Sequence, residues 1–317
     1  MHRIGIVIFL LMYFVVASAQ QRPQYTQYIF NNYILNPAIS GIENYTDVKL
    51  SYRNQWVGID DGPATASFSV HAPLGKNFLR ENANSSDGKG SHPMSRSFVQ
   101  SYKAADPHHG IGLNLVSDRT GPITRLDLNI TYAYHLGLSE KLNLAVGLAG
   151  GISKEDLDLS RITLETDIDP AVTGGGQSNL KPNLGFGVWV YSARYFGGLA
   201  VQQLLGQPVV FTDVQTGNEG KQVPHYFLTG GYKVFLSDEI AAIPSIMVKH
   251  VAPAPLSVDV NLKVAFRDWV WVGGSYRKRD SFAGMAGFNV NHLFNLSYAY
   301  DFTTSTLRTV SDGTHEI

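Results

Sequence analysis

Residues 124–136 read TRLDLNITYAYHL, and two sets of side chains alternate along this stretch. The first set is apolar and consists of Leu126, Leu128, Ile130, Tyr132, Tyr134 and Leu136. The second set is mostly polar and consists of Arg125, Asp127, Asn129, Thr131, Ala133 and His135. Successive side chains of a β-strand point to opposite faces, so the stretch predicts a strand with one apolar face and one polar face.

The same alternation returns at residues 142–148, 256–266 and 294–302. Strands of soluble sandwiches are typically about 5–6 residues long, whereas a tilted strand needs about 9–11 residues to cross a membrane. Most of the alternating stretches have the longer length. Aromatic residues gather toward the strand ends, as interfacial girdles do, at Tyr132, Tyr134, Phe266, Trp269, Trp271, Tyr298 and Tyr300. The pattern favours an all-β, transmembrane, antiparallel outer-membrane β-barrel over a secreted sandwich.

Segmentation of the chain predicts a barrel of about 14 strands. The expected strands cover residues 45–53, 63–72, 108–118, 123–137, 141–152, 182–192, 194–203, 224–236, 240–250, 256–267, 269–277, 281–290 and 292–302, and a last one starts near Thr314. From the fourth strand on, tight turns alternate with connections that are mostly longer. We expect the tight turns to be periplasmic and the longer loops extracellular. The polar insertion 73–107 lies on the side of the tight turns, and within it residues 80–93 have a composition typical of disorder.

The start of the chain predicts export. A basic start, Met1–Arg3, precedes the apolar run Ile4–Val16 and the small residues Ala17–Ala19. The run is too short to cross a bilayer about 30 Å thick, so residues 1–19 are predicted to be a signal peptide; the alternative is a short buried N-terminal helix. The mature chain then begins near Gln20 or Gln21.

Composition excludes several classes of protein. The formal net charge is −1, so no basic field invites nucleic acid. The sequence has no Cys, which excludes a disulfide scaffold and a lipid anchor on an N-terminal Cys. No apolar run long enough for a transmembrane helix follows residue 16. Charged residues make up 16% of the chain, against 16 Tyr, 16 Phe and 31 Gly, a balance that suits strands and turns.

The segment before the first strand, residues 25–41, reads YTQYIFNNYILNPAISG. Its aromatics follow neither a helical nor a strand period. Irregular backbone at membrane height is tolerated only inside protein or along a water-filled cavity. We therefore expect residues 20–44 to be a periplasmic, plug-like segment at the mouth of the barrel formed by residues 45–317. The alternative is a tether that becomes ordered on meeting a partner.

Four motifs carry a resemblance to a known family. They are YTQYIFNNYILNPAISG, SYRNQWVGIDDGPATASFSVHAPL (residues 51–74), HGIGLNLVSDRTGP (residues 109–122) and TYAYHL (residues 131–136). With these motifs the chain resembles the PorP/SprF family of type IX secretion system proteins of Bacteroidetes-type bacteria, over most of its mature length. The resemblance implies a non-enzymatic barrel in the outer membrane of a Gram-negative bacterium, contacting outer-membrane lipid. It also implies a role in exporting, or holding at the surface, cargo with type IX C-terminal signals (adhesins, secreted enzymes, gliding motility), together with periplasmic components of that machinery.

Two features depart from the family pattern. The connection 73–107 is longer than usual, and the chain given stops at Ile317, where relatives continue through several alternating residues. A barrel in lipid must close, because unpaired backbone groups cost several kcal/mol each. Either the closing strand is short or the chain as given is incomplete, and we expect the latter.

The candidate partner-contact or family-motif residues are Tyr25, Tyr28, Phe30, Tyr33, Asn36, Pro37, Arg53, Asn54, Gln55, Trp56, Asp118, Gly121 and Pro122. Structural readings compete with these assignments. Trp56 suits an interfacial anchor, and Arg53 suits a lumen-facing residue paired with an acid. Asp118, Gly121 and Pro122 are typical of a turn.

No catalytic, metal or cofactor site is predicted. His108 and His109 are adjacent on an expected strand and therefore point to opposite faces, so they do not jointly bind a metal. Nucleophile, base and orienting residue do not come together in the expected strands. The inward charges are expected to form a salt-bridge network in the lumen, made of Asp47, Lys49, Arg53, Arg125, Asp127, Asp259, Lys263 and Asp301.

Two functions remain open at this level. One is an accessory or anchor for type IX export, and the other is a passive outer-membrane channel for small or hydrophobic solutes. Both have a polar lumen, so alternation alone does not separate them, whereas the family motifs favour the first.

Overall fold

The computed structural model describes residues 25–75, 104–161, 178–209, 220–237, 239–266, 269–290 and 294–317. The predicted signal peptide and the polar run 80–93 lie outside these residues. Within the described part of the chain, no helix is both long and apolar enough to cross a membrane.

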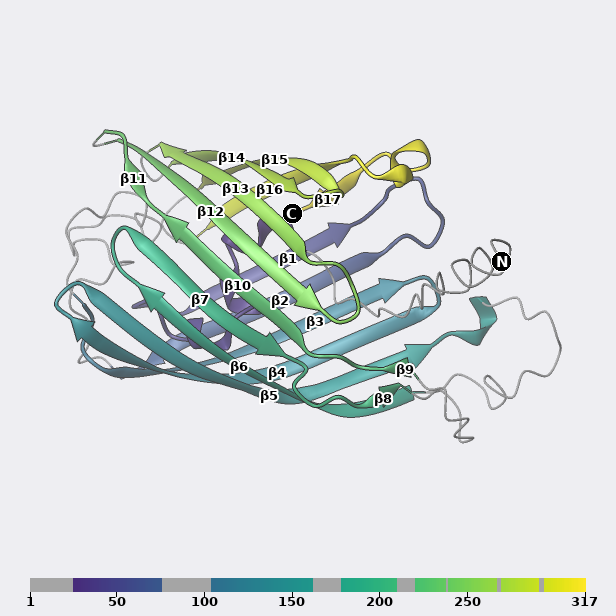
Figure 1. Ribbon diagram of the computed structural model, residues 1–317, viewed down its shortest axis with the longest axis horizontal. Coiled ribbons are helices and arrows are strands. Elements are labelled where there is room, and N and C mark those ends of the chain that lie inside the picture. Colours follow the sequence, from purple (N-terminus) through teal and green to yellow (C-terminus); the bar gives the residue numbers. More distant parts are fainter. Residues whose placement is uncertain are drawn as a thin grey trace, which may run out of the picture.

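The strands form one antiparallel sheet that closes on itself (Figure 1). Fourteen strands make the wall, because the two-residue β11 continues β10 beside β12. They are β1 (Asp47–Asn54), β2 (Ala64–Leu74), β3 (His108–Thr120), β4 (Ile123–Ser139), β5 (Leu142–Leu157), β6 (Ser178–Tyr191), β7 (Tyr195–Gln202), β10 (His225–Tyr232), β12 (Ile240–Val251), β13 (Ser257–Phe266), β14 (Val270–Arg277), β15 (Ser281–Asn289), β16 (Asn295–Thr303) and β17 (Thr314–Glu316). The predicted all-β, antiparallel barrel is confirmed.

Two sets of pairings complete the ring of strands. Strand β10 pairs with β7 on one side and with β12 on the other. The three-residue β17 pairs with β1 at Arg53 and Asn54, and with β16 from Ala299 to Asp301. A closing strand that starts near Thr314 was predicted, and β17 begins at Thr314.

Sequence alternation becomes inside–outside alternation in the wall. Along β4 the polar set that starts at Arg125 is buried, whereas Ile130 on the other face is 65% exposed. In β13, buried Asp259 and Asn261 flank Val260, which is 49% exposed. Apolar side chains therefore cover the outer surface and polar side chains face the lumen, as the alternation predicts.

Some strands extend into stretches that the sequence predicts to be loops. Strands β5 and β6 extend beyond residues 152 and 182 into the stretch predicted as a loop. A small hairpin, β8 (Pro208–Val209) with β9 (Gly220–Lys221), forms in the connection between β7 and β10. The insertion begins later than expected, because Pro73 and Leu74 still pair with β3.

The two ends of the barrel carry different connections. We call one the long-loop end; it carries the connections 55–63, 121–122, 158–177, 203–224, 252–256, 278–280 and 304–313. The other is the short-turn end, with connections 75–107, 140–141, 192–194, 236–239, 267–269 and 290–294. Strand β1 starts at the short-turn end and finishes at the long-loop end.

Three short 3-10 helices precede the wall and lie inside it (Figure 1). They are η1 (Gln27–Ile29), η2 (Asn32–Ile34) and η3 (Pro37–Ile39). We call residues 25–44 the plug segment. Two further 3-10 turns, η5 (Leu159–Arg161) and η6 (Thr306–Thr309), lie in connections at the long-loop end.

Candidate functional site: the plugged lumen

The plug segment runs through the lumen from one end of the barrel to the other. Its start contacts residues near the long-loop end, where Arg53 of β1 and Arg277 of β14 lie close to the ends of their strands. Its last turn reaches the short-turn end, where His108 of β3 bonds the Gly41 carbonyl at 3.1 Å. The segment thus extends further than the single mouth at which the sequence places it.

Short 3-10 turns explain why the aromatics of the segment follow neither common period. Runs of this helix rarely exceed 3–4 residues, and each new turn points its side chains at a different part of the wall. The last turn starts with Asn36, whose side chain accepts a bond from the Ala38 amide at 3.0 Å, followed by Pro37 at the first helical position. Asn and Pro are favoured at these two positions of a helix start.

Aromatic contacts hold the first part of the plug segment to strands β13 and β14. Phe30 stacks on Trp271 with ring centroids 4.0 Å apart. The Lys263 ammonium lies 4.7 Å from the Phe30 centroid, within the range of a cation–π contact. Tyr28 is 2% exposed, and its hydroxyl is bonded by the Asn261 side chain. These candidate residues therefore face the lumen wall.

The second part of the plug segment packs against wall positions that have no side chain. The Asn36 amide donates to the carbonyls of Val188 on β6 and Leu199 on β7, at 3.1 and 3.2 Å. A Cβ atom on Gly147 of β5 would lie 2.5 Å from the Ala38 Cα, and one on Gly187 would lie 2.9 Å from the Asn36 Cγ. Plug backbone occupies the space beside Gly147, and the Asn36 side chain occupies the space beside Gly187, so glycine fits at both positions without a clash.

Three buried histidines surround the end of the plug segment. His135 bonds the Ser40 carbonyl at 2.8 Å, and the Gly41 amide donates to His71 Nδ1 at 3.2 Å. The rings of His108 and His135 stack at 4.4 Å. His109 lies on the outer face beside Tyr132, so the predicted opposite orientation of His108 and His109 is confirmed.

Tyr33 links the middle of the segment to β4. Its hydroxyl lies 2.7 Å from Thr131 Oγ1, and its ring lies 4.6 Å from the His71 ring. Ser40 also donates to Thr131 Oγ1, at 2.7 Å. One wall hydroxyl therefore holds two points of the plug segment.

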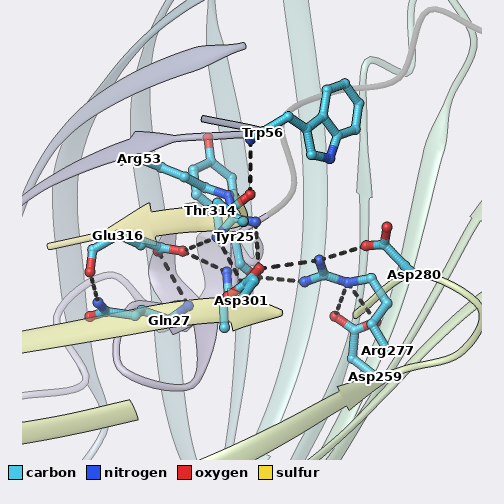
Figure 2. Close-up of polar contacts among 12 residues, drawn as sticks. Tyr25, Gln27, Arg53, Trp56, Asp259, Arg277, Asp280, Asp301, Thr314 and Glu316 are labelled. Atoms are coloured by element: carbon cyan, nitrogen blue, oxygen red, sulfur yellow. Dashed lines mark hydrogen bonds and ion pairs between the residues drawn. The ribbon is translucent and has the colours of Figure 1, made fainter. Parts of the chain in front are cut away.

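A buried ion-pair cluster surrounds the start of the plug segment at the long-loop end (Figure 2). Arg53 Nη2 lies 2.7 Å from Asp301 Oδ2, and Arg53 Nη1 lies 2.7 Å from Glu316 Oε2. Arg277 donates to Asp259 at 3.0 Å and to Asp280 at 3.1 Å. The predicted pairing of Arg53 with an acid in the lumen is thus present.

A second charged cluster lies on the opposite wall. Glu155 of β5 pairs with Arg125 of β4 and with Lys181 of β6, the latter at 3.0 Å. Gln222 adds a bond to the same carboxylate at 3.3 Å. Breaking a buried pair by removing one partner typically costs about 3–5 kcal/mol, so both clusters constrain the wall.

A cavity remains between the plug segment and strands β3 to β6. A row of amides crosses its wall: Asn183 donates to Asn129 at 2.8 Å, and Asn129 donates to Asn114 at 3.0 Å. Tyr25, Tyr33 and Phe227 line the same cavity. The lumen is therefore neither filled throughout nor freely open at this height.

The remaining motif residues lie at the long-loop end. The backbone amide of Gln55 donates to the Pro63 carbonyl at 2.8 Å, and that of Trp56 donates to Thr314 Oγ1 at 3.1 Å. In Figure 2 the Trp56 indole points away from the ion-pair cluster. Asn54 pairs with His315 across the β1–β17 joint.

The Asp118 motif divides between a strand and a turn. Asp118 lies in β3 and accepts a bond from the Thr65 hydroxyl at 2.6 Å. Gly121 and Pro122 form the turn into β4, and Gly121 has a φ of 57°, the left-handed region that favours glycine. The side chains of this motif therefore do not join the plug contacts.

Sequence reasoning missed Thr26, Gln27 and Glu316 of the ion-pair cluster, in which the backbone amides of Thr26 and Gln27 donate to the Glu316 carboxylate. It also missed the lumen-facing glycines. A signal for them was present, since Gly147 takes the place of a polar residue on the inward face of the alternating stretch 142–148. No group of three or more metal-ligating side chains occurs among the described residues.

Comparisons with known proteins identify one family. The family model of the type IX secretion system membrane protein PorP/SprF matches residues 17–317. Two solved mutants of Rhodopseudomonas blastica porin are similar to the chain at 9% identity and a TM-score of 0.32, covering 86% of this chain and 97% of the porin. A TM-score this low gives no basis for transferring a property. No curated protein matches the chain.

Proposed function

Because the chain belongs to the PorP/SprF family of type IX secretion system membrane proteins, we propose that it is a non-enzymatic outer-membrane component of that system. In this role it supports export or surface attachment of cargo with type IX C-terminal signals, such as adhesins and secreted enzymes. It works with components of the machinery on the periplasmic side.

The plugged lumen is the observation that carries this proposal. Tyr28 and Tyr33 are each 2% exposed inside the barrel, and Asn36 bonds two strands of the wall. A channel for diffusing solutes needs a continuous path, whereas an anchor needs a rigid wall. Aromatic packing, ion pairs and hydrogen bonds of side-chain amides across the lumen make the wall rigid.

The competing function is a passive channel for small or hydrophobic solutes. The cavity beside Asn129 and Phe227 is the feature that favours it. In that case the plug segment would move aside to complete the path.

A deletion strain separates the two functions. We expect loss of the gene to abolish surface display of a type IX cargo protein and, in a gliding bacterium, to impair motility, while uptake of small solutes is unchanged. Copurification of a tagged chain from its own membrane is expected to recover type IX components. Normal cargo display together with reduced solute uptake would contradict the anchor and favour the channel.

A further inference from the structure

The first turn of the plug segment contacts all three strands at the joint where β17 closes the barrel (Figure 2). We propose that this turn, through Thr26 and Gln27, positions β17, so that the barrel closes on the plug segment and not around an empty lumen. This assignment concerns assembly of the barrel and does not depend on the function proposed above.

Ladder pairing of β17 is short. It pairs with β1 at two positions, Arg53 with Glu316 and Asn54 with His315, and with β16 at three. Further backbone hydrogen bonds join Tyr52 with Ile317 at 2.9 Å and the Val57 amide with the Gly313 carbonyl at 2.9 Å. By contrast, β3 and β4 pair without interruption from His108–His135 to Thr120–Ile123. Side-chain contacts with the plug segment add to this backbone pairing in placing β17.

Glu316 of β17 receives its bonds from the plug segment and from β1. Its Oε2 accepts hydrogen bonds from the backbone amide of Thr26 at 2.8 Å and from Arg53 at 2.7 Å. Its Oε1 accepts one from the backbone amide of Gln27 at 3.2 Å. The residue is 1% exposed. A buried carboxylate needs such partners, because an unpaired charge in the lumen is costly.

Thr26 and Gln27 also bond β16. The Thr26 hydroxyl donates to Asp301 Oδ2 at 2.6 Å and accepts from Arg53 at 2.9 Å. The side-chain amide of Gln27 donates to the backbone carbonyl of Glu316 on β17 at 2.9 Å. The side-chain oxygen of Gln27 accepts a hydrogen bond from Ser297 of β16 at 2.6 Å. Without the plug segment, acids on both β16 and β17 would lose donors at once.

Cysteine pairs measure this closure directly, since the sequence has no Cys of its own. Asn54→Cys with His315→Cys reports the β1–β17 joint, and Tyr132→Cys with Leu148→Cys reports the β4–β5 pair far from it. Directly opposed residues in antiparallel strands lie at the Cα spacing that a disulfide accepts. The full chain is unfolded in urea, refolded into detergent micelles and oxidised, and each crosslink is timed.

We expect Thr26→Val with Gln27→Ala to slow the β1–β17 crosslink about tenfold and to leave the β4–β5 crosslink unchanged. The double variant loses the Thr26 hydroxyl bond to Asp301 and the Gln27 side-chain bond to the Glu316 carbonyl, whereas the backbone amides of both residues stay in place. The single variant Thr26→Ser keeps the hydroxyl and is expected to form the β1–β17 crosslink at the native rate. Equal β1–β17 rates in the double variant and the native chain would overturn the proposal. Equal slowing at both pairs would also overturn it, because the turn would then support the whole barrel and not this joint.

Discussion

At the scale of single residues, the absence of a side chain fixes how the plug segment sits. Gly147 lies so close to Ala38 that an added Cβ would clash with it, at 2.5 Å from the Ala38 Cα, whereas Gly150, three residues further along β5, is exposed. Overpacking a filled site typically costs about 1–3 kcal/mol. The plug and the wall therefore constrain each other at the level of one carbon atom.

We accordingly expect Gly147→Ala to lower the free energy of unfolding by about 1–3 kcal/mol, measured as the shift of the urea midpoint in detergent. Gly150→Ala is the matched control, because the nearest atom to its new Cβ would be 3.9 Å away. Equal stability of the two variants would mean that the plug segment is not closely packed against β5 at Gly147.

Asn36 gives a second test at this scale. Asn36→Ala removes two bonds to wall carbonyls and the cap of η3, and we expect a loss of about 2–3 kcal/mol in the same assay. Asn32 offers a control on the same segment, since its side-chain oxygen has no partner among the described residues. Asn32→Ala is expected to stay within about 0.5 kcal/mol of the native chain.

At the scale of strands, the outer wall was predictable and the lumen contents were not. Alternation in 124–136 identifies β4 and its two faces because side-chain direction in a strand is a local property. The partners of Thr26 depend on Glu316, 290 residues away, and no local pattern encodes that contact. The acidic partner of Arg53 was expected as a type of residue, and the fold alone identifies it as Asp301 and Glu316.

Face assignment yields a prediction for one strand. Val260→Arg places a charge on the outer face of β13 and should cost about 2–4 kcal/mol near the bilayer midplane, measured by folding into lipid vesicles. Val260→Leu is the control. Ser51→Arg, on the lumen face of β1 beside Lys49 and only half-buried, is expected to be milder. A cost for Ser51→Arg as large as that for Val260→Arg would contradict the assignment of faces.

At the scale of the whole molecule, the plug segment makes the lumen part of the core. The polar side chains that a wide barrel normally exposes to water are here divided between hydrogen bonds to the plug segment and two ion-pair clusters. An Arg placed at Asn261, which is 2% exposed and bonds Tyr28, would therefore meet packed atoms and not water. Substitutions on the lumen face differ in cost according to whether the plug covers them.

Orientation in the membrane is the last property that the asymmetry of the two ends predicts. Short turns of such barrels are periplasmic and longer loops extracellular, so the long-loop end should face outward. Ser160 is exposed at that end, and Ser237 is exposed at the short-turn end. We expect Ser160→Cys to react with a membrane-impermeant maleimide on intact cells and Ser237→Cys to react only after the outer membrane is permeabilised. The native chain, which has no Cys, provides the background. The reverse labelling would place the start of the plug segment, which Arg53 and Glu316 hold at the long-loop end, on the periplasmic side.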